Sequence, residues 1–326
     1  MILVLFGISI VVFGALLFFA QNQANKLVHP KRRHANSTPA NLGIDHWEDV
    51  SFITKDGLTL RAWFVPPKPT ANGATVICAH GTGANRGALL PHAALLHQAD
   101  YGVLLFDFRH HGASDGTVSS LGIHEIHDLR ASFDYLRSRP DVNPDRIALI
   151  GHSMGGATII RAAARCLNVQ ALVVISAVSS LSQNLTDGVR YVTKLPAFPL
   201  APLIVKICEW KVQGRISDMT PINDLEHLGN TPLLLVYGDQ DKFVPLENGR
   251  RLRRARRHDT TLAVVRGAGH RSILSKRFLP SYQTKLMAFL ATHMQVTTLE
   301  PRVPEQSSQL ATLFMAIQHA KTSATP

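Results

Sequence analysis

Short apolar runs alternate with helix-length amphipathic stretches from Trp47 to about Leu290, and this alternation limits the fold more than any other feature of the chain. Six of the runs are apolar almost without interruption, as strands of a parallel sheet must be when both faces are covered. The intervening stretches, such as Ile123–Arg139 and Met154–Cys166, have the length and pattern of helices. The sequence therefore predicts an α/β fold, a mostly parallel eight-stranded sheet with helices on both faces.

The first two predicted strands are separated only by a turn at Asp56-Gly57, so they are expected to pair as an antiparallel hairpin. The remaining six supply the parallel part of the sheet. The eight predicted strands are Glu48–Thr54, Leu58–Val65, Ala74–Ala79, Gly102–Phe106, Arg146–Ile150, Ala171–Ile175, Pro232–Tyr237 and Thr261–Arg266.

A second constraint stands at the N-terminus, where Ile2–Ala20 are 19 consecutive residues without a charge. At about 1.5 Å per residue, a helix of this length spans a hydrocarbon core of about 30 Å. A cleaved signal peptide is the alternative, but it needs a basic segment before an apolar core of about 7–15 residues, and no Lys or Arg precedes this run. We therefore expect a retained transmembrane helix. Its basic flank, Lys26 to Arg33, predicts a cytoplasmic location for the rest of the chain.

These features divide the chain into a transmembrane anchor (1–24), a juxtamembrane linker (25–45), an α/β domain (46–294) and a polar tail (295–326). Within the domain, the stretch 177–230 breaks the alternation and is far longer than an ordinary connection, so it is predicted to be a small lid. One helix is expected in the tail, over Ser308–His319. A chain that begins near Asn36 is expected to be soluble and active, because no other stretch of the chain has an uncharged apolar run comparable to Ile2–Ala20.

The net charge of +11 is partly carried by an arginine-rich cluster over Arg250–Arg257. Such a cluster can bind nucleic acid, rest on anionic lipid or form a solvated helix face. No zinc finger, helix-turn-helix or RNA-binding aromatic motif accompanies it, so no nucleic-acid partner is expected.

The three cysteines are odd in number and have no metal-like spacing. His124 and His127 stand three apart rather than the four of a zinc-protease helix, which favours a polar helix face over a metal site.

The sequence Gly151-His152-Ser153-Met154-Gly155 directly follows one predicted strand and directly precedes a predicted helix. A sharp turn there strains the backbone of the serine, and glycine two residues away on each side removes clashes with Cβ atoms. The turn exposes the hydroxyl of Ser153 above the sheet and places the Met154 N–H at a helix N-terminus. A tight turn without chemistry is the alternative, but the strand–turn–helix context favours Ser153 as a nucleophile.

A serine nucleophile needs a base, and the base needs an orienting carboxylate. The strand Pro232–Tyr237 is followed by Asp239 and Asp241, and the last strand is followed by His270. All of these lie just past the carboxyl ends of their strands, where sites collect in open α/β sheets. His270 is the predicted base. Both aspartates remain candidates on the residues alone, since either can serve as a turn or capping residue.

An oxyanion hole needs a second backbone donor beside Met154, from the loop that follows the third strand. The sequence there is His80-Gly81-Thr82-Gly83, and the Thr82 N–H is the candidate donor. A flexible glycine loop is the alternative.

Residues from about Trp47 to Leu290 resemble the α/β-hydrolase fold family, in its serine-hydrolase branch of esterases, lipases, thioesterases and prolyl-aminopeptidase-type peptidases. With its anchor, the chain looks like membrane-anchored members of that branch. In the family, the acid of a segment that ends in Val-Pro is the later aspartate, which selects Asp241. The family commonly has glycine where His110 stands, and lipases often have a third glycine where Thr82 stands. The matching stretches are His80–Gly83, Asp107–Ser114, Gly151–Gly155, Gly238–Pro245 and Gly269-His270.

The sequence thus predicts a membrane-anchored serine hydrolase that cleaves carboxylic esters through an acyl-enzyme, without a metal or cofactor. The apolar lid and the anchor favour a small-molecule or lipid ester as substrate. Two alternatives remain: a peptidase or amidase with the same three residues, and a non-enzymatic membrane scaffold. The natural substrate and the oligomeric state are left open by the sequence.

Overall fold

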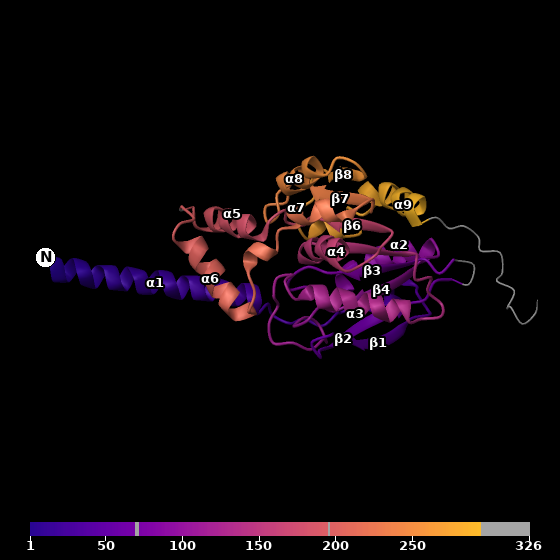
Figure 1. Ribbon diagram of the computed structural model, residues 1–326, viewed down its shortest axis with the longest axis horizontal. Helices are drawn as coiled ribbons and strands as arrows, with labels where there is room; N and C mark the ends of the chain where they lie inside the picture. The colour runs from indigo at the N-terminus through magenta and orange to yellow at the C-terminus, as the bar shows by residue number, and fades with distance from the viewer. Residues whose placement is uncertain (69–71, 195, 295–326) are drawn as a thin grey trace, which may run out of the picture. The chain divides into compact units, whose positions relative to one another are not determined.

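An eight-stranded sheet organises the chain in the computed structural model, which describes residues 1–68, 72–194 and 196–294 (Figure 1). The strand order is β1-β2-β4-β3-β5-β6-β7-β8. β1 pairs with β2 as the predicted antiparallel hairpin, β2 is antiparallel to β4, and all later pairs are parallel. The strands are β1 Glu48–Ile53, β2 Thr59–Val65, β3 Thr75–Ala79, β4 Gly102–Phe106, β5 Ile147–His152, β6 Ala171–Ile175, β7 Leu233–Gly238 and β8 Thr260–Val265.

Helices cover both faces of this sheet, and the predicted fold class is confirmed (Figure 1). The α-helices are α1 Ile2–Val28, α2 Leu90–Gln98, α3 Glu125–Arg137, α4 Met154–Arg165, α5 Leu181–Thr193, α6 Leu200–Val212, α7 Pro221–Asp224, α8 Glu247–Ala255 and α9 Pro280–Met294. Short 3₁₀ turns connect them: η1 Pro39–Leu42, η2 Arg86–Leu89, η3 Ile216–Asp218, η4 Leu225–Leu228 and η5 Ser272–Leu274.

The core forms two layers, one on each side of the sheet. In β3, Val76 and Cys78 belong to the layer that α2 and α9 cover, while Ile77 and Ala79 belong to the layer that α3, α4 and α8 cover. Both faces of β3 are therefore buried, which explains its uninterrupted apolar sequence. Each fully buried Ile or Leu contributes roughly 1.5–3 kcal/mol to the stability of the fold.

The segment 177–230 carries α5, α6 and short turns, and none of its described residues belongs to a strand. Helices α5 and α6 form a hairpin outside the sheet, beside α1 (Figure 1). Helix α6 packs along α1 through small and apolar side chains. The buried residues on the two facing sides are Ala20, Ala24 and Val28 of α1, and Leu200, Ala201, Ile204, Cys208 and Val212 of α6. Small residues allow two helix backbones to approach closely.

Helix α1 is long and apolar enough to cross a membrane, and no residue of its most apolar 18-residue window is buried. The helix continues to Val28, so residues 25–28 of the predicted linker extend it. The rest of the linker lies on the domain. His29 Nδ1 is 3.1 Å from the Thr117 carbonyl, and Arg32 Nη2 donates to the Gly112 carbonyl at 3.2 Å. The predicted tail, 295–326, and its helix over Ser308–His319 lie outside the described residues.

The packing of α1 changes one expectation. Ala20, Ala24 and Val28 belong to one of the two core layers of the sheet, so a chain that begins near Asn36 loses part of its core as well as the apolar segment. The sequence predicts a soluble and active truncated form only if the N-terminal segment is separable from the domain. The contact between α1 and α6 argues against such a separation.

We predict that a chain beginning at Asn36 is less stable than one beginning at Leu17, which keeps the buried turns of α1. The loss is on the order of 3–5 kcal/mol, because the apolar side of α6 becomes uncovered. Thermal unfolding of both forms in the same detergent, with the full chain as reference, measures the difference. Equal melting temperatures for the two truncated forms would show that α1 adds nothing to the domain.

Candidate active site

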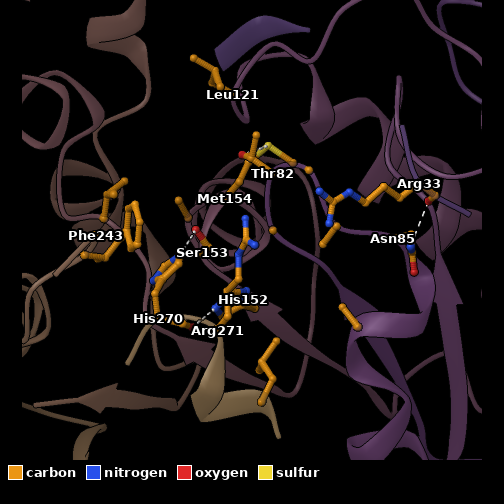
Figure 2. Close-up of a pocket in the computed structure, with 18 of the residues that line it drawn as sticks. Arg33, Thr82, Asn85, Leu121, His152, Ser153, Met154, Phe243, His270 and Arg271 are labelled. Atoms are coloured by element: carbon orange, nitrogen blue, oxygen red, sulfur yellow. Dashed lines mark hydrogen bonds between the residues drawn. The ribbon is translucent and has the colours of Figure 1, made fainter. Parts of the chain in front are cut away.

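The predicted site residues all follow parallel strands at the carboxyl edge of the sheet. Thr82 follows β3, Ser153 follows β5, Asp241 follows β7 and His270 follows β8. Since these strands are parallel, their ends meet on one side of the molecule, and the structure brings the four residues together there. Figure 2 shows Thr82, Ser153 and His270 at this edge.

Ser153 occupies the sharp turn between β5 and α4. Its φ of 54° and ψ of −118° form a backbone conformation that residues other than glycine rarely adopt. Its N–H donates to the Ile175 carbonyl at 2.9 Å, which ties the turn to β6. The two neighbouring glycines are required by space. A Cβ on Gly151 would lie 2.5 Å from the Gly155 carbonyl oxygen, and a Cβ on Gly155 would lie 2.3 Å from the Ala79 carbonyl oxygen. Helix α4 therefore starts directly against the sheet.

His270 lies between Ser153 and Asp241. Its Nδ1 is 2.7 Å from Asp241 Oδ2, and its Nε2 is 3.0 Å from Ser153 Oγ. A carboxylate only accepts hydrogen bonds, so the proton is on Nδ1 and Nε2 is free to accept from the serine hydroxyl. The other oxygen of Asp241 accepts from the N–H groups of Phe243 and Val244 at 2.9 and 2.8 Å. These bonds fix the carboxylate, which fixes the imidazole.

The competing acid, Asp239, has a different environment. Its Oδ1 accepts from the Gly267 N–H at 2.7 Å, so it joins the turn after β7 to the turn after β8. It is exposed, whereas Asp241 is buried. The geometry places Asp241, and not Asp239, in contact with His270.

The predicted oxyanion loop passes directly beside the serine. A Cβ on Gly81 would lie 3.0 Å from Ser153 Cβ, and Thr82 Oγ1 is 3.3 Å from Met154 Sδ. Figure 2 shows Thr82 and Met154 next to Ser153. Within the described part of the chain, the backbone N–H groups of Thr82 and Met154 have no hydrogen-bond partner. Both amides are thus available to an acceptor bound beside Ser153.

Two buried histidines hold this loop, a role that the sequence prediction did not give them. His80 accepts from the Phe108 N–H through Nε2 at 3.1 Å and donates through Nδ1 to the Gly81 carbonyl at 2.8 Å. His111 accepts from the Gly83 N–H at 3.0 Å and donates to the Arg109 carbonyl at 2.8 Å. Burial lowers the pKa of both imidazoles, in keeping with the neutral form that each pair of bonds requires.

His152, next to Ser153 in the turn, hydrogen-bonds the backbone of His270. Its Nε2 is 2.9 Å from the His270 carbonyl oxygen. Burial, together with repulsion from His270, lowers the pKa of His152 to about 3, so it is neutral and donates this bond. The one sequence feature that pointed to a role for His152 in the site was its place beside Ser153. The contact with His270 joins positions 118 residues apart, which no local pattern shows.

Ser153 and His270 open into a cavity of about 1380 Å³. One part of its wall is apolar, and basic side chains line another part. Among the described residues, no Asp or Glu lines it. The apolar lining includes Leu27, Leu121, Val178, Leu181, Leu185, Met219 and Phe243, and the basic lining includes Lys26, Arg33 and Arg271. Such a space suits an amphipathic ligand.

Arg109, within the matching stretch Asp107–Ser114, and His124 both have structural partners. Arg109 forms ion pairs with Asp56 and Asp128 at 2.8 and 2.7 Å. His124 lies 2.9 Å from the Val212 carbonyl through Nε2, and the described residues contain no group of three or more His, Cys, Asp or Glu placed to hold a metal.

The arginine cluster of α8 is largely engaged within the fold. Arg250, Arg251 and Arg254 all pair with Glu247, and Arg256 is buried and donates to the Gly229 carbonyl at 2.8 Å. These contacts are typical of a solvated helix face with its own ion pairs.

Comparisons with known proteins bear on the fold that carries this site. The family described as serine aminopeptidase, S33, matches residues 70–221. A solved esterase from Pyrococcus furiosus superposes with a TM-score of 0.67 and 29% identity, covering 82% of this chain and 99% of that one. The chain has the α/β-hydrolase fold.

Two curated relatives extend the comparison. The uncharacterized protein YfhR of Salmonella typhi is 26% identical over 285 residues, 82% of this chain and 88% of that protein. The α/β-hydrolase domain-containing protein WAV2 of Arabidopsis thaliana is 34% identical over 121 residues, 37% of this chain and 38% of that one. The family resemblance inferred from the motifs is therefore confirmed, and the chain is a hydrolase of esterase-like fold.

We predict that Asp241→Asn lowers turnover by about 10⁴-fold, because the imidazole loses the carboxylate that orients it. Asp239→Asn is the matched control. Its bond from the Gly267 N–H can be kept by the amide oxygen, so the loss should be far smaller. Steady-state kinetics on one ester substrate compares the two, and the reverse ranking would assign the acid to Asp239.

Proposed function

We propose that this hydrolase cleaves carboxylic esters with Ser153 as nucleophile, His270 as general base and Asp241 as the orienting acid. The observation that carries the proposal is the hydrogen-bonded series from Ser153 to His270 to Asp241, at 3.0 and 2.7 Å. Its order and its position at the carboxyl edge of the sheet fit nucleophilic acyl transfer.

In the proposed reaction, His270 takes the hydroxyl proton as Ser153 Oγ attacks the ester carbonyl. The N–H groups of Thr82 and Met154 stabilise the oxyanion, and His270 then gives the proton to the leaving alcohol. Water, activated by His270, attacks the acyl-enzyme and releases the acid. The neutral histidines His80 and His111 support the oxyanion loop during both steps. Amides aimed at the developing charge typically contribute about 10²–10³-fold each to the rate.

An apolar wall beside Ser153 supports esters with an acyl chain, as in a lipase-like enzyme. A peptidase or amidase is the second candidate, because the family that matches residues 70–221 is described as serine aminopeptidase. Panels of p-nitrophenyl esters and aminoacyl anilides separate the two, since a peptidase should turn over the anilides at least as well.

We predict that Ser153→Ala abolishes hydrolysis and labelling by a fluorophosphonate, while its thermal unfolding stays close to that of the parent chain. Alanine removes only the hydroxyl at a position that is already strained. Peptide mapping of the labelled parent should find the probe on Ser153. Full labelling of the variant would overturn the assignment.

We further propose that α1 is a retained anchor and that the hydrolase domain faces the cytoplasm. Burial of Ala20, Ala24 and Val28 against α6 supports retention, and the basic flank from Lys26 to Arg33 supports the orientation.

The full chain should stay with membranes through a carbonate wash, and protease added to intact cells should leave the domain whole. A lysed sample, in which the same protease digests the domain, is the control. Digestion from outside the cell would reverse the orientation. A mature N-terminus near Gln21 or Gln23 would replace the anchor with a cleaved signal peptide.

A further inference from the structure

The turn between α5 and α6 is the part of the lid hairpin that lies furthest from the sheet. The hairpin is tied to the domain at both of its ends. The Leu181 N–H donates to the Met219 carbonyl at 3.0 Å, and His124 Nε2 lies 2.9 Å from the Val212 carbonyl. The turn therefore points away from the domain, and Figure 1 shows it directed along α1 toward the N-terminus.

Helix α6 extends along α1 to the level of the uncharged segment. Its 13 residues are about 20 Å long, roughly half the length of the 27-residue α1. Leu16 is half-buried, while the α1 residues before it are exposed. Ala20, the last residue of the uncharged segment Ile2–Ala20, is buried and α6 packs on α1, so the start of α6 lies level with this segment (Figure 1). A membrane that holds this segment must also meet the start of α6.

The exposed side chains at this turn suit the border of a membrane. Val192 and Phe198 are 70% and 78% exposed, and Tyr191 is half exposed. The Lys194 ammonium lies 4.6 Å from the centre of the Tyr191 ring. Aromatic, aliphatic and basic residues gather in this way where a protein enters the headgroup layer, because the rings sit among headgroups and the lysine reaches water or phosphate.

The same elements form a wall of the candidate site. Lys26 and Leu27 of α1, together with Leu181 and Leu185 of α5, line the cavity into which Ser153 opens. On the basic side of the cavity, Lys26, Arg33 and Arg271 form no ion pair with any described residue. In Figure 2, Arg33 lies across this cavity from Ser153 and His270. Unpaired cations beside an apolar wall match the anionic headgroup and the chain of a lipid.

We propose that the turn of the α5–α6 hairpin inserts into the membrane that holds α1, and that a lipid ester passes from this bilayer to Ser153 between α1 and α5. The occupant of the exposed turn is the bilayer, because α6 is packed on the helix that enters it. The insertion does not depend on the proposed function, whereas the passage of substrate rests on that function.

The first experiment measures insertion without reference to activity. Val192→Cys is made in the full chain together with Cys166→Ser, which removes the exposed cysteine and leaves the buried Cys78 and Cys208. An environment-sensitive fluorophore on residue 192 is read in vesicles of phosphatidylcholine and phosphatidylglycerol with a nitroxide lipid. Ile53→Cys, on the exposed edge of β1, is the matched control. Quenching at 192 but not at 53 is expected, and absence of quenching at 192 overturns the proposal.

The second experiment tests the passage of substrate. Val192→Ser with Phe198→Ser should lower kcat/KM for an ester embedded in these vesicles by about tenfold, a change of about 1.4 kcal/mol. Hydrolysis of a water-soluble p-nitrophenyl ester should be unchanged, as should both activities of Ile53→Ser. An equal loss on both substrates, or no loss on either, overturns the passage. If the parent chain cleaves no ester at all, the proposed function fails while the quenching result still decides the insertion.

Discussion

Parallel strands with both faces buried point their carboxyl ends in one direction, and every residue of the candidate site depends on this arrangement. Residues that follow β3, β5, β7 and β8 are far apart in the sequence but meet at one edge of the sheet. The close contact of α4 with that edge adds the second condition, because Gly151 and Gly155 leave no room for any side chain. The strained backbone of Ser153, which costs of order 1–3 kcal/mol in such cases, is held by this packing.

Much of the fold could be predicted because its signals are local. Strands covered on both faces need apolar residues at every position, so runs such as Gly102–Phe106 and Ala171–Ile175 coincide with β4 and β6. Ser153 was marked by its turn between a strand and a helix, and His270 by its place after the last strand. The choice between Asp239 and Asp241 needed the resemblance to a family. In the structure it follows from which carboxylate reaches the imidazole.

The parts that escaped prediction are contacts between distant segments. His80 and His111 each link the loop after β3 to the loop after β4, and a histidine in a loop carries no sign of its partner. Ala20 and Ala24 likewise resemble any small residues at the end of an apolar helix. Their burial under α6 in the folded structure is what shows that α1 belongs to the core. The N-terminal helix is therefore more than a tether, since Leu27 also lines the cavity beside Ser153.

The pairing of α1 with α6 also limits the order in which segments of the chain can pack during synthesis. Helix α1 leaves the ribosome first, yet its partner begins more than 170 residues later, at Leu200. Throughout that interval the small-residue side of α1 lacks its native cover. The candidate site is completed later still, because Asp241 and His270 are added after α6. A long separation between contacting segments slows folding and lengthens the exposure of apolar surface.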